Sequence, residues 1–353
     1  MILKNYVHGG DVYQNRVTLD FSANVNPYGT PEPVKAAIRA AAEEVDRYPD
    51  PYCTALRARL SALHGVSPDE ILCGNGAAEL IFSFVQAVRP KRVLLPVPSF
   101  AEYETALRCA DATPAFYPLA RENGFAVTEE ILGAITKDTD ALLLCSPNNP
   151  TGRSVDSALL LRILDRCRET GTWLFLDECF QDLCDADKAF SLVGRLAEGD
   201  RVLILRAFTK TYGMAGVRLG YAVSKNGDLL RRMSETVQPW NVSTVAQKAG
   251  LAALDCPDWA QKARALFGTE KAYLLQALRA LGISVLYGDA NYLLLSGVPG
   301  LYEKLLARGI LVRSCGNYCG LVPGDVRIAV RTHAENEALI AAITEVLHGQ
   351  DRH

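Results

Sequence analysis

The stretch that decides the fold is residues 141–152, which read ALLLCSPNNPTG. Its first residues are apolar, and a turn of Pro, Asn and Gly follows at once. A short apolar run that ends in turn residues predicts a strand buried on both faces. Further runs of this kind lie along the chain at Ile71–Cys73, Arg92–Val97, Trp173–Leu176, Val202–Leu205 and Leu219–Val223. Amphipathic helical patterns separate several of them, as at Ala78–Val88 and Ser157–Glu169. Strands that alternate with helices predict an α/β fold with a mostly parallel sheet.

From about Val245 onward the pattern changes. Long helical patterns come first and short strands and helices follow, at Thr244–Leu254, Pro257–Leu281, Tyr292–Leu295, Leu301–Ala307, Leu311–Arg313, Val326–Val330 and Glu335–Leu347. This order predicts a second, smaller α+β domain. We therefore expect a large domain over residues 31–240 and a small domain built from residues 1–30 and 241–353.

The composition excludes several classes of protein. Of 353 residues, 49% are apolar and 22% are charged, as in ordinary globular proteins. Lysine and arginine number 37 against 40 acidic residues, so there is no basic field to bind nucleic acid or an anionic membrane. No apolar run approaches the roughly 20 residues of a membrane span, and the first residues lack the apolar core of a signal peptide. We expect a cytoplasmic protein with no nucleic acid or membrane as partner.

The 10 cysteines are scattered along the chain, several of them within apolar runs. Their spacing does not match a zinc site. We therefore expect reduced, buried thiols and no metal.

A candidate anion site follows the first predicted strand. Gly76, Ala77 and Ala78 open a helix there, and the backbone amides at a helix N-terminus can bind a phosphate. The same stretch is close to a dinucleotide-binding fingerprint, but Glu79 stands at the third glycine position and no acid follows about 20 residues later. A nicotinamide cofactor is therefore disfavoured, while a plain strand–helix turn stays an alternative.

Three other predicted strands end in polar residues, at the sheet edge where ligands of parallel sheets bind. Asn149 follows one, Asp177 the next, and Thr209 and Lys210 the third, with Arg218 shortly after. Taken singly, these are a turn residue, a helix cap and a solvated lysine. Together with a phosphate site they are the set that pyridoxal phosphate requires, because the cofactor needs a lysine for its aldehyde, a carboxylate for its ring nitrogen and donors for its phosphate.

The order of these motifs resembles that of a known superfamily. Residues 148–152 read NNPTG, Asp177 lies 28 residues after Asn149, and Arg218 lies 8 residues after Lys210. This order resembles the fold-type I pyridoxal-phosphate enzymes, which share the aspartate-aminotransferase-like fold, over nearly the whole chain. Within their histidinol-phosphate aminotransferase branch, four stretches are similar to the L-threonine-O-3-phosphate decarboxylases of cobalamin biosynthesis: HGGD (8–11), DFSANVNP (20–27), RYPD (47–50) and RSCGNY (313–318) with RIAVR (327–331).

The resemblance implies a role for each matching cofactor residue. Lys210 would hold the cofactor covalently, Asp177 would keep the pyridine nitrogen protonated, and Asn149 would hydrogen-bond ring O3′. Phe100 would stack on the ring. The cofactor phosphate would be bound by Gly76, Ala77, Ala78, Thr209, Arg218 and, from the neighbouring subunit, Tyr48. The contact of Tyr48 implies a homodimer with shared active sites.

The resemblance also implies that the N-terminal segment covers a small phosphorylated amino-acid substrate. Arg327 would bind the substrate carboxylate as a bidentate pair, and Arg313 would serve the substrate phosphate. The other residues implied in substrate binding are His8, Gly9, Asn24 and Asn149.

Two departures from the usual aminotransferase pattern bear on the reaction. Ala207 replaces a Ser or Thr that often contacts the phosphate, and Phe180 replaces a Tyr that often donates to O3′. The decarboxylases share the second change, which favours decarboxylation of L-threonine O-3-phosphate to (R)-1-amino-2-propanol O-2-phosphate. A histidinol-phosphate-type aminotransferase and a serine-phosphate decarboxylase stay as alternatives, because the sequence does not show which bond at Cα breaks. The complete set of Lys210, Asp177 and Arg327 disfavours a non-catalytic pyridoxal-phosphate-binding protein.

Overall fold

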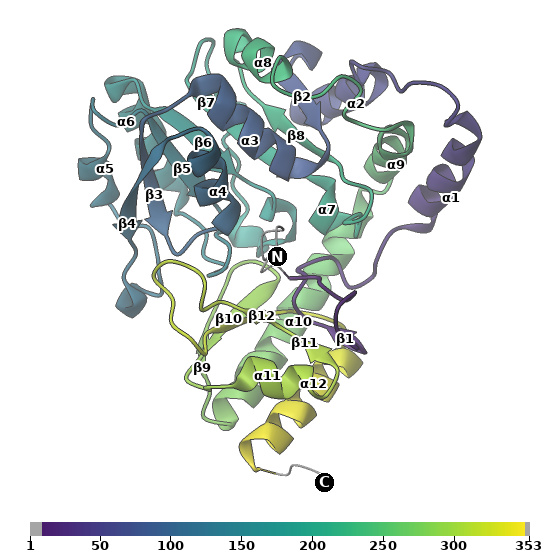
Figure 1. Ribbon diagram of the computed structural model, residues 1–353, viewed down its shortest axis with the longest axis vertical. Coiled ribbons are helices and arrows are strands. Elements are labelled where there is room, and N and C mark those ends of the chain that lie inside the picture. Colours follow the sequence, from purple (N-terminus) through teal and green to yellow (C-terminus); the bar gives the residue numbers. More distant parts are fainter. Residues whose placement is uncertain (1–8, 350–353) are drawn as a thin grey trace.

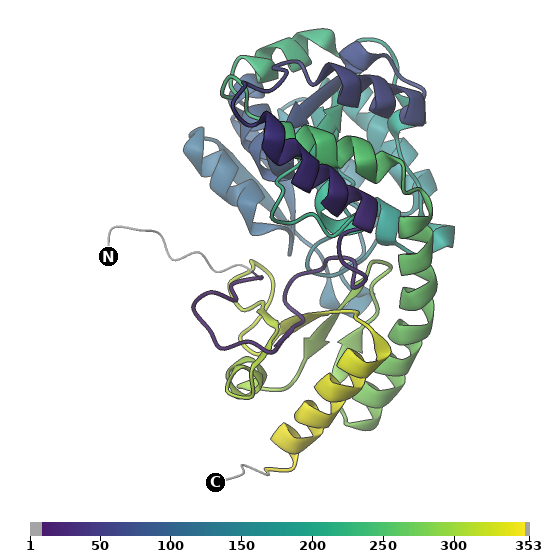
Figure 2. The ribbon, with the colours of Figure 1, turned by 90° about the vertical axis from the view of Figure 1, so that its right-hand side faces the viewer.

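The computed structural model describes residues 9–349, which form two parts stacked along the long axis of the molecule (Figure 1). The upper part contains a large sheet with helices on both of its faces, and the lower part contains a small sheet. Helix α10 (Asp258–Ala280) runs along one side and joins the two parts (Figure 2). No helix within the described range is long and apolar enough to cross a membrane.

The large sheet has seven strands in the order β2-β8-β7-β6-β5-β3-β4. In that order they span Ile71–Gly74, Gly220–Val223, Val202–Ala207, Trp173–Asp177, Ala141–Cys145, Arg92–Val97 and Thr113–Pro118. Strands β7, β6, β5, β3 and β4 pair in parallel, whereas β8 runs antiparallel to both β7 and β2. The predicted α/β fold with a mostly parallel sheet is therefore confirmed.

Helices cover both faces of this sheet because its strands are apolar on both sides. Along β7, Leu203 and Leu205 face one hydrophobic core while Ile204 faces the other, and all three are fully buried. Each such side chain stabilises the fold by about 1.5–3 kcal/mol. Packed on the first core are α3 (Gly76–Val88), α4 (Ala101–Cys109) and α8 (Gly227–Ser234), and on the second α2 (Thr54–His64), α5 (Ile131–Ala134), α6 (Ser157–Thr170) and α9 (Thr244–Leu254). Helix α1 (Glu32–Ala41) lies against α9.

The small sheet is antiparallel and has four strands in the order β12-β13-β10-β9. They span Arg313–Ser314, Val326–Ala329, Tyr292–Ser296 and Ser284–Leu286. Its core is shared with α10, α11 (Leu301–Leu306) and α12 (His333–Leu347). The N-terminal segment joins this part, since β1 (Leu19–Asp20) pairs with β11 (Ile310–Leu311) and Phe21 is buried in the same core.

Three features differ from the sequence-based expectations. Strand β4 was not predicted, because Pro114 and Pro118 and an exposed pattern obscure it, and such a strand is tolerated only at a sheet edge. The short strand β9 was not predicted either. The single strand predicted over Leu311–Arg313 is two strands, because β11 pairs with β1 whereas β12 pairs with β13.

The packing of α9 bears on the division into domains. Ala246, Ala249 and Ala253 of this helix are buried in the core of the large sheet. We therefore propose that the boundary, predicted at residue 240, lies instead between α9 and α10.

Candidate active site

A cavity of about 390 Å³ lies at the carboxyl ends of β5, β6 and β7, between the two parts of the molecule. Lys210, Asp177 and Asn149 line it from the large sheet, and Arg313 and Arg327 line it from the small sheet. It is further lined by Ala77, Ala78, Phe100, Thr209 and Arg218 from the large part and by Gly9, Gly10, Ser22, Ala23 and Val25 from the N-terminal segment. The parallel strands thus bring together side chains that lie far apart in the sequence, as predicted.

Asp177 is the last residue of β6, and its side chain is held by neutral donors. The Tyr103 hydroxyl donates to Oδ2 at 2.6 Å, and the Cys179 amide donates to Oδ1 at 2.9 Å. Burial, together with the nearby charge of Asp177, holds the pKa of Tyr103 well above its usual range. The phenol therefore stays a donor at neutral pH. A carboxylate held in this way is suited to pair with a protonated ring nitrogen.

Lys210 lies in the short helix α7 (Phe208–Thr211), immediately after β7. Burial and the positive charges of Arg327 and Arg218 lower the pKa of its amine to about 8, although the carboxylate of Asp177 acts in the opposite direction. The amine lies 5.5 Å from the centre of the Phe180 ring. Near neutral pH this lysine therefore presents a larger free-amine fraction than an ordinary lysine, as a nucleophile or proton carrier needs.

Arg327 is fixed by three oxygen acceptors and one ring. It donates to the Asn149 side-chain oxygen at 2.5 Å and to the Ser22 carbonyl at 2.6 Å. With the Asn24 amide oxygen turned toward it, Asn24 accepts at 3.1 and 3.3 Å. The guanidinium also lies 5.4 Å from the centre of the Tyr292 ring. These neighbours orient the guanidinium without neutralising its charge.

Arg313 is held by its own turn. It donates to the Ser314 carbonyl at 2.5 Å and to the Asn317 side-chain oxygen at 3.1 Å, and it lies 5.1 Å from the centre of the Tyr318 ring. Arg313 and Arg327 stand directly opposite each other on β12 and β13. They are only 3% and 5% exposed, and neither forms an ion pair with an acid of residues 9–349. An anionic ligand in the cavity would stabilise two guanidinium groups in this position.

The start of α3 forms the cradle expected for a phosphate. The N-cap residue Asn75 makes no side-chain cap hydrogen bond, and Ala77 and Ala78 of the first turn line the cavity. Gly76 has φ +77°, and a Cβ there would lie 2.4 Å from Nη2 of Arg218. Only glycine therefore lets the guanidinium approach the helix start, where amide dipoles and a cation can bind one anion together.

These residues fit pyridoxal phosphate. The uncapped helix start with Arg218 suits its phosphate, Asp177 suits its ring nitrogen, and the amine of Lys210 suits its aldehyde. No cluster of three or more His, Cys, Asp or Glu side chains in the described part of the chain is placed to hold a metal ion. The cysteines are all free thiols, but the expectation that they are buried is wrong for Cys109 and Cys319, which are exposed.

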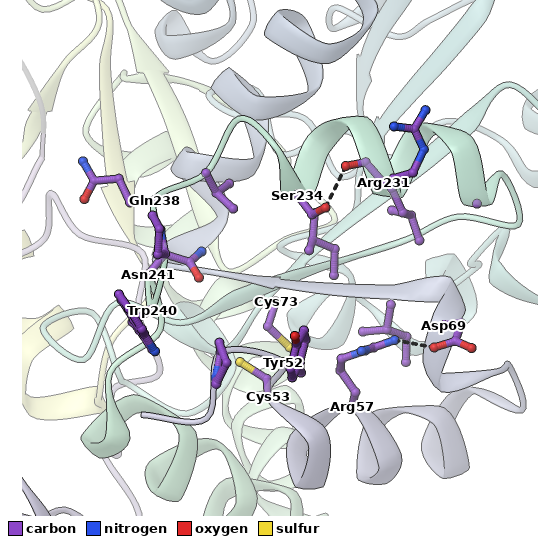
Figure 3. A pocket seen from close by; sticks show the side chains of 17 residues that line it. Tyr52, Cys53, Arg57, Asp69, Cys73, Arg231, Ser234, Gln238, Trp240 and Asn241 are labelled. Carbon is purple, nitrogen blue, oxygen red and sulfur yellow. Dashed lines mark hydrogen bonds and ion pairs between the residues drawn. The ribbon is translucent and has the colours of Figure 1, made fainter. Parts of the chain in front are cut away.

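Among the described residues, three predicted site residues do not line the cavity: Gly76, Asn24 and Tyr48. Gly76 and Asn24 lie beside Arg218 and Arg327, which do line it. His8 falls outside the described residues. Tyr48 is 78% exposed and stacks on Trp240, with ring centres 4.4 Å apart. Trp240 and Tyr52 line a second cavity of about 420 Å³ beside edge strand β2, which Figure 3 shows. The predicted contact of Tyr48 is with another subunit, so its role stays a prediction.

The structure adds site residues that the sequence did not single out. Tyr103 lies on α4, three residues after the N-cap residue Phe100, and the two rings pack edge to face with their centres 5.6 Å apart. Tyr318 and Asn317 lie within the stretch that carries the resemblance, but only the structure shows that both contact Arg313. Tyr292 lies between Phe180 and Arg327, with its ring in contact with both.

Comparisons with known proteins show the family of the chain. The family described as aminotransferase class I and II matches residues 16–343. The threonine-phosphate decarboxylase of Salmonella typhimurium is 38% identical over 361 residues, which cover 99% of this chain and 99% of that protein. The solved L-threonine-O-3-phosphate decarboxylase of Porphyromonas gingivalis is 26% identical with a TM-score of 0.83, and covers 94% of this chain and 99% of its own. The histidinol-phosphate aminotransferase of Clostridium acetobutylicum gives 0.86 at 26% identity with the same coverage.

Proposed function

The chain belongs to the class I and II aminotransferase family, and we propose that it decarboxylates L-threonine O-3-phosphate to (R)-1-amino-2-propanol O-2-phosphate. The full-length similarity to the decarboxylase of Salmonella typhimurium supports this choice. Its predicted place in the cytoplasm and in cobalamin biosynthesis is part of the same proposal.

The observation that carries the proposal is the pair of opposed arginines. Arg313 and Arg327 are cross-strand neighbours, both buried, and like charges in that position destabilise a sheet. An amino acid with a phosphorylated side chain offers each arginine its own anion, a carboxylate for Arg327 and a phosphate for Arg313. Charge-assisted bonds of this kind are about twice as strong as neutral ones.

When bound, pyridoxal phosphate supplies an electron sink for the electron pair left on Cα as one of its bonds breaks. The residues of this chain decide which bond that is. Arg327, oriented by Asn149 and the Ser22 carbonyl, fixes the direction of the substrate carboxylate. In the proposed reaction the bond from Cα to the carboxylate breaks, CO₂ leaves and Cα gains a proton. Lys210, with an amine pKa of about 8, is suited to hold that proton.

Transamination is the second candidate, because the same residues serve it and the fold of the Clostridium acetobutylicum aminotransferase is equally similar. Phe180 favours decarboxylation, since it places a ring against Tyr292 where the aminotransferase pattern has a hydroxyl donor. The test is to incubate the holoenzyme with L-threonine O-3-phosphate and no keto acid. We expect CO₂ and amino-propanol phosphate in equal amounts. In a parallel incubation with an added keto acid, transfer of the amino group to that acid without release of CO₂ would support transamination.

We also propose a homodimer with shared sites, because aromatic side chains are exposed together beside the second cavity. Tyr48 and Tyr52 are 78% and 72% exposed. Trp240 stacks on Tyr48 and lines the same cavity as Tyr52, as Figure 3 shows for Tyr52 and Trp240. Lys210→Ala and Tyr48→Ala, each inactive alone, should be unfolded, mixed and refolded. If Tyr48 serves the partner's site, mixed dimers contain one native site and activity returns to about a quarter of that of the wild type. No recovery, with mixed dimers verified by mass, would place Tyr48 in its own chain's site or in none.

A further inference from the structure

A contact between the two parts of the molecule lies next to the substrate side of the cavity. The loop of residues 119–127 follows β4 in the large part, and the turn of residues 315–325 joins β12 to β13 in the small part. Side chains of the loop and the turn form one small hydrophobic cluster with Leu294 of β10, and its other members are Leu119, Phe125, Cys315, Tyr318 and Leu321. We call this contact the clasp. It joins segments about 200 residues apart in the sequence.

Arg121 and Asp325 form the polar centre of the clasp. Nη2 of Arg121 donates to Asp325 Oδ2 at 2.6 Å, and its Nη1 donates to the Ser296 hydroxyl at 3.0 Å. Ser296 in turn donates to Asp325 Oδ1 at 2.6 Å. The Asp325 side chain is fully buried, whereas that of Arg121 is 42% exposed. Burial alone would raise the pKa of Asp325, but the hydrogen bonds from Arg121, Ser296 and Val322 lower it below the usual value, so the carboxylate stays charged.

Asp325 also fixes both ends of the turn. Its carboxylate accepts from the Val322 amide at 3.0 Å, and its carbonyl accepts from the Cys315 amide at 2.8 Å. Within the turn, the Tyr318 amide donates to the Cys315 carbonyl at 3.0 Å. The position of the turn therefore depends on a carboxylate whose cationic partner comes from the other part of the molecule.

The same turn holds Arg313. The Asn317 side chain accepts from the guanidinium at 3.1 Å, and the Tyr318 ring lies 5.1 Å beneath it. Arg327, in contrast, is held by Asn149, the Ser22 carbonyl and Asn24, all of which lie outside the turn. A substitution in the clasp should therefore displace Arg313, which is predicted to bind the substrate phosphate, more than it displaces Arg327.

We propose that Arg121 is a positioning residue for the substrate phosphate, which acts across the domain boundary through Asp325 and the turn that holds Arg313. Arg121 does not line the cavity and touches no reacting group. The proposal rests on the proposed function, since it takes the substrate to be phosphorylated.

The test compares two ligands that differ only in the phosphate and are not turned over. Binding of 1-amino-2-propanol phosphate and of 1-amino-2-propanol to the holoenzyme is measured by titration calorimetry. The ratio of the two dissociation constants gives the phosphate preference. We expect Arg313→Ala to lower it by about 100-fold and Arg121→Gln by about tenfold, as for the loss of charge-assisted hydrogen bonds. In the Arg313→Ala background, Arg121→Gln should cause no further fall, and Arg121→Lys should restore part of the preference.

The matched control is Arg59→Gln, which breaks an ion pair of the same 2.6 Å length between exposed side chains remote from the cavity. It should leave the ratio unchanged. If Arg121→Gln does not fold, Ser296→Ala replaces it, because this variant removes a hydroxyl that bonds both partners of the pair.

The outcomes separate the two proposals. A wild-type enzyme with no phosphate preference would overturn the proposed substrate class. A wild-type preference that Arg121→Gln leaves intact, or a loss that simply adds to that of Arg313→Ala, would overturn the role of Arg121 and leave the proposed function standing. Equal weakening of both ligands would show that the clasp stabilises the fold only, and would also overturn it.

Discussion

The lowered pKa of Lys210 can be measured directly in the cofactor-free protein. Burial and the charges of Arg327 and Arg218 bring it to about 8, from an ordinary value of 10.5. At pH 7 the free amine is then about 9% of the total instead of about 0.03%, a gain of roughly 300-fold. Reductive methylation reacts only with the free amine. Its rate at Lys210, followed by peptide mass mapping against pH, should therefore have a midpoint near 8.

A substitution tests the cause of this shift. Arg327→Gln removes the neighbouring charge that lowers the Lys210 pKa most after burial, so the midpoint should rise. A rise of half a pH unit would slow labelling at pH 7 about threefold. The same protein labelled in denaturant supplies the unshifted profile. A native midpoint above 10 would refute the argument from burial, and an unchanged midpoint in Arg327→Gln would show that the two side chains do not interact.

The lowered pKa of Lys210 also makes the free energy of unfolding depend on pH. Because the folded protein binds its Lys210 proton less tightly than the unfolded chain, the cofactor-free fold should gain stability as the pH rises from about 8 to about 10.5. Lys210→Met should lack this gain. Denaturant unfolding of both proteins at several pH values measures it.

Three further predictions follow from individual contacts. Tyr103→Phe removes the 2.6 Å donor to Asp177 and should weaken cofactor binding about tenfold, measured by equilibrium titration; an unchanged affinity would mean that this bond does not matter to the ring nitrogen site. Burial and the charge of Arg206 lower the pKa of His64 to about 4, so the fold should lose stability as the pH falls from 6.5 toward 4, and His64→Gln should lose less; equal acid sensitivity would contradict the shift. Arg327→Ala should weaken the binding of every amino acid, whereas Arg313→Ala should weaken the binding of phosphorylated amino acids only. Titration calorimetry with L-threonine and with its phosphate measures both effects. Identical effects of the two substitutions would contradict the assignment of the carboxylate to Arg327 and of the phosphate to Arg313.

The part of the site that lies on the large sheet could be predicted because its geometry is set by topology. Asp177 ends a buried parallel strand, Asn149 and Lys210 each follow one, and parallel strands end at one edge of the sheet. Strands β3 and β5 begin and end where the apolar runs predict them, since residues buried on both faces leave an unbroken apolar pattern.

The parts that could not be predicted depend on contacts between distant segments. Arg121 and Asp325 lie 204 residues apart, and neither stands in a pattern that differs from an ordinary surface loop. The alanines of α9 predict a helix but do not indicate which of the two cores covers them. Tyr103 and Tyr318 lie close in the sequence to motif residues, but a sequence motif does not show which way a side chain points.

The distribution of charge in the cavity argues for the substrate class without reference to any relative. Among residues 9–349, the cavity is lined by one carboxylate, Asp177, and by four basic side chains, Lys210, Arg218, Arg313 and Arg327. Arg218 lies at the helix start. In the proposed function it would be matched by the cofactor phosphate, and Arg327 would be matched by the carboxylate that every amino acid carries. An amino acid with a neutral side chain would leave Arg313 buried opposite Arg327 with only neutral acceptors, at the cost of an unpaired charge. A single methyl group in an apolar pocket changes the binding free energy by only about 1–3 kcal/mol. The binding free energies of serine phosphate and threonine phosphate should therefore differ less from each other than either differs from that of the unphosphorylated amino acid. This distribution of charge supports the proposal that the cavity selects for a phosphorylated side chain and that Arg313 binds its phosphate.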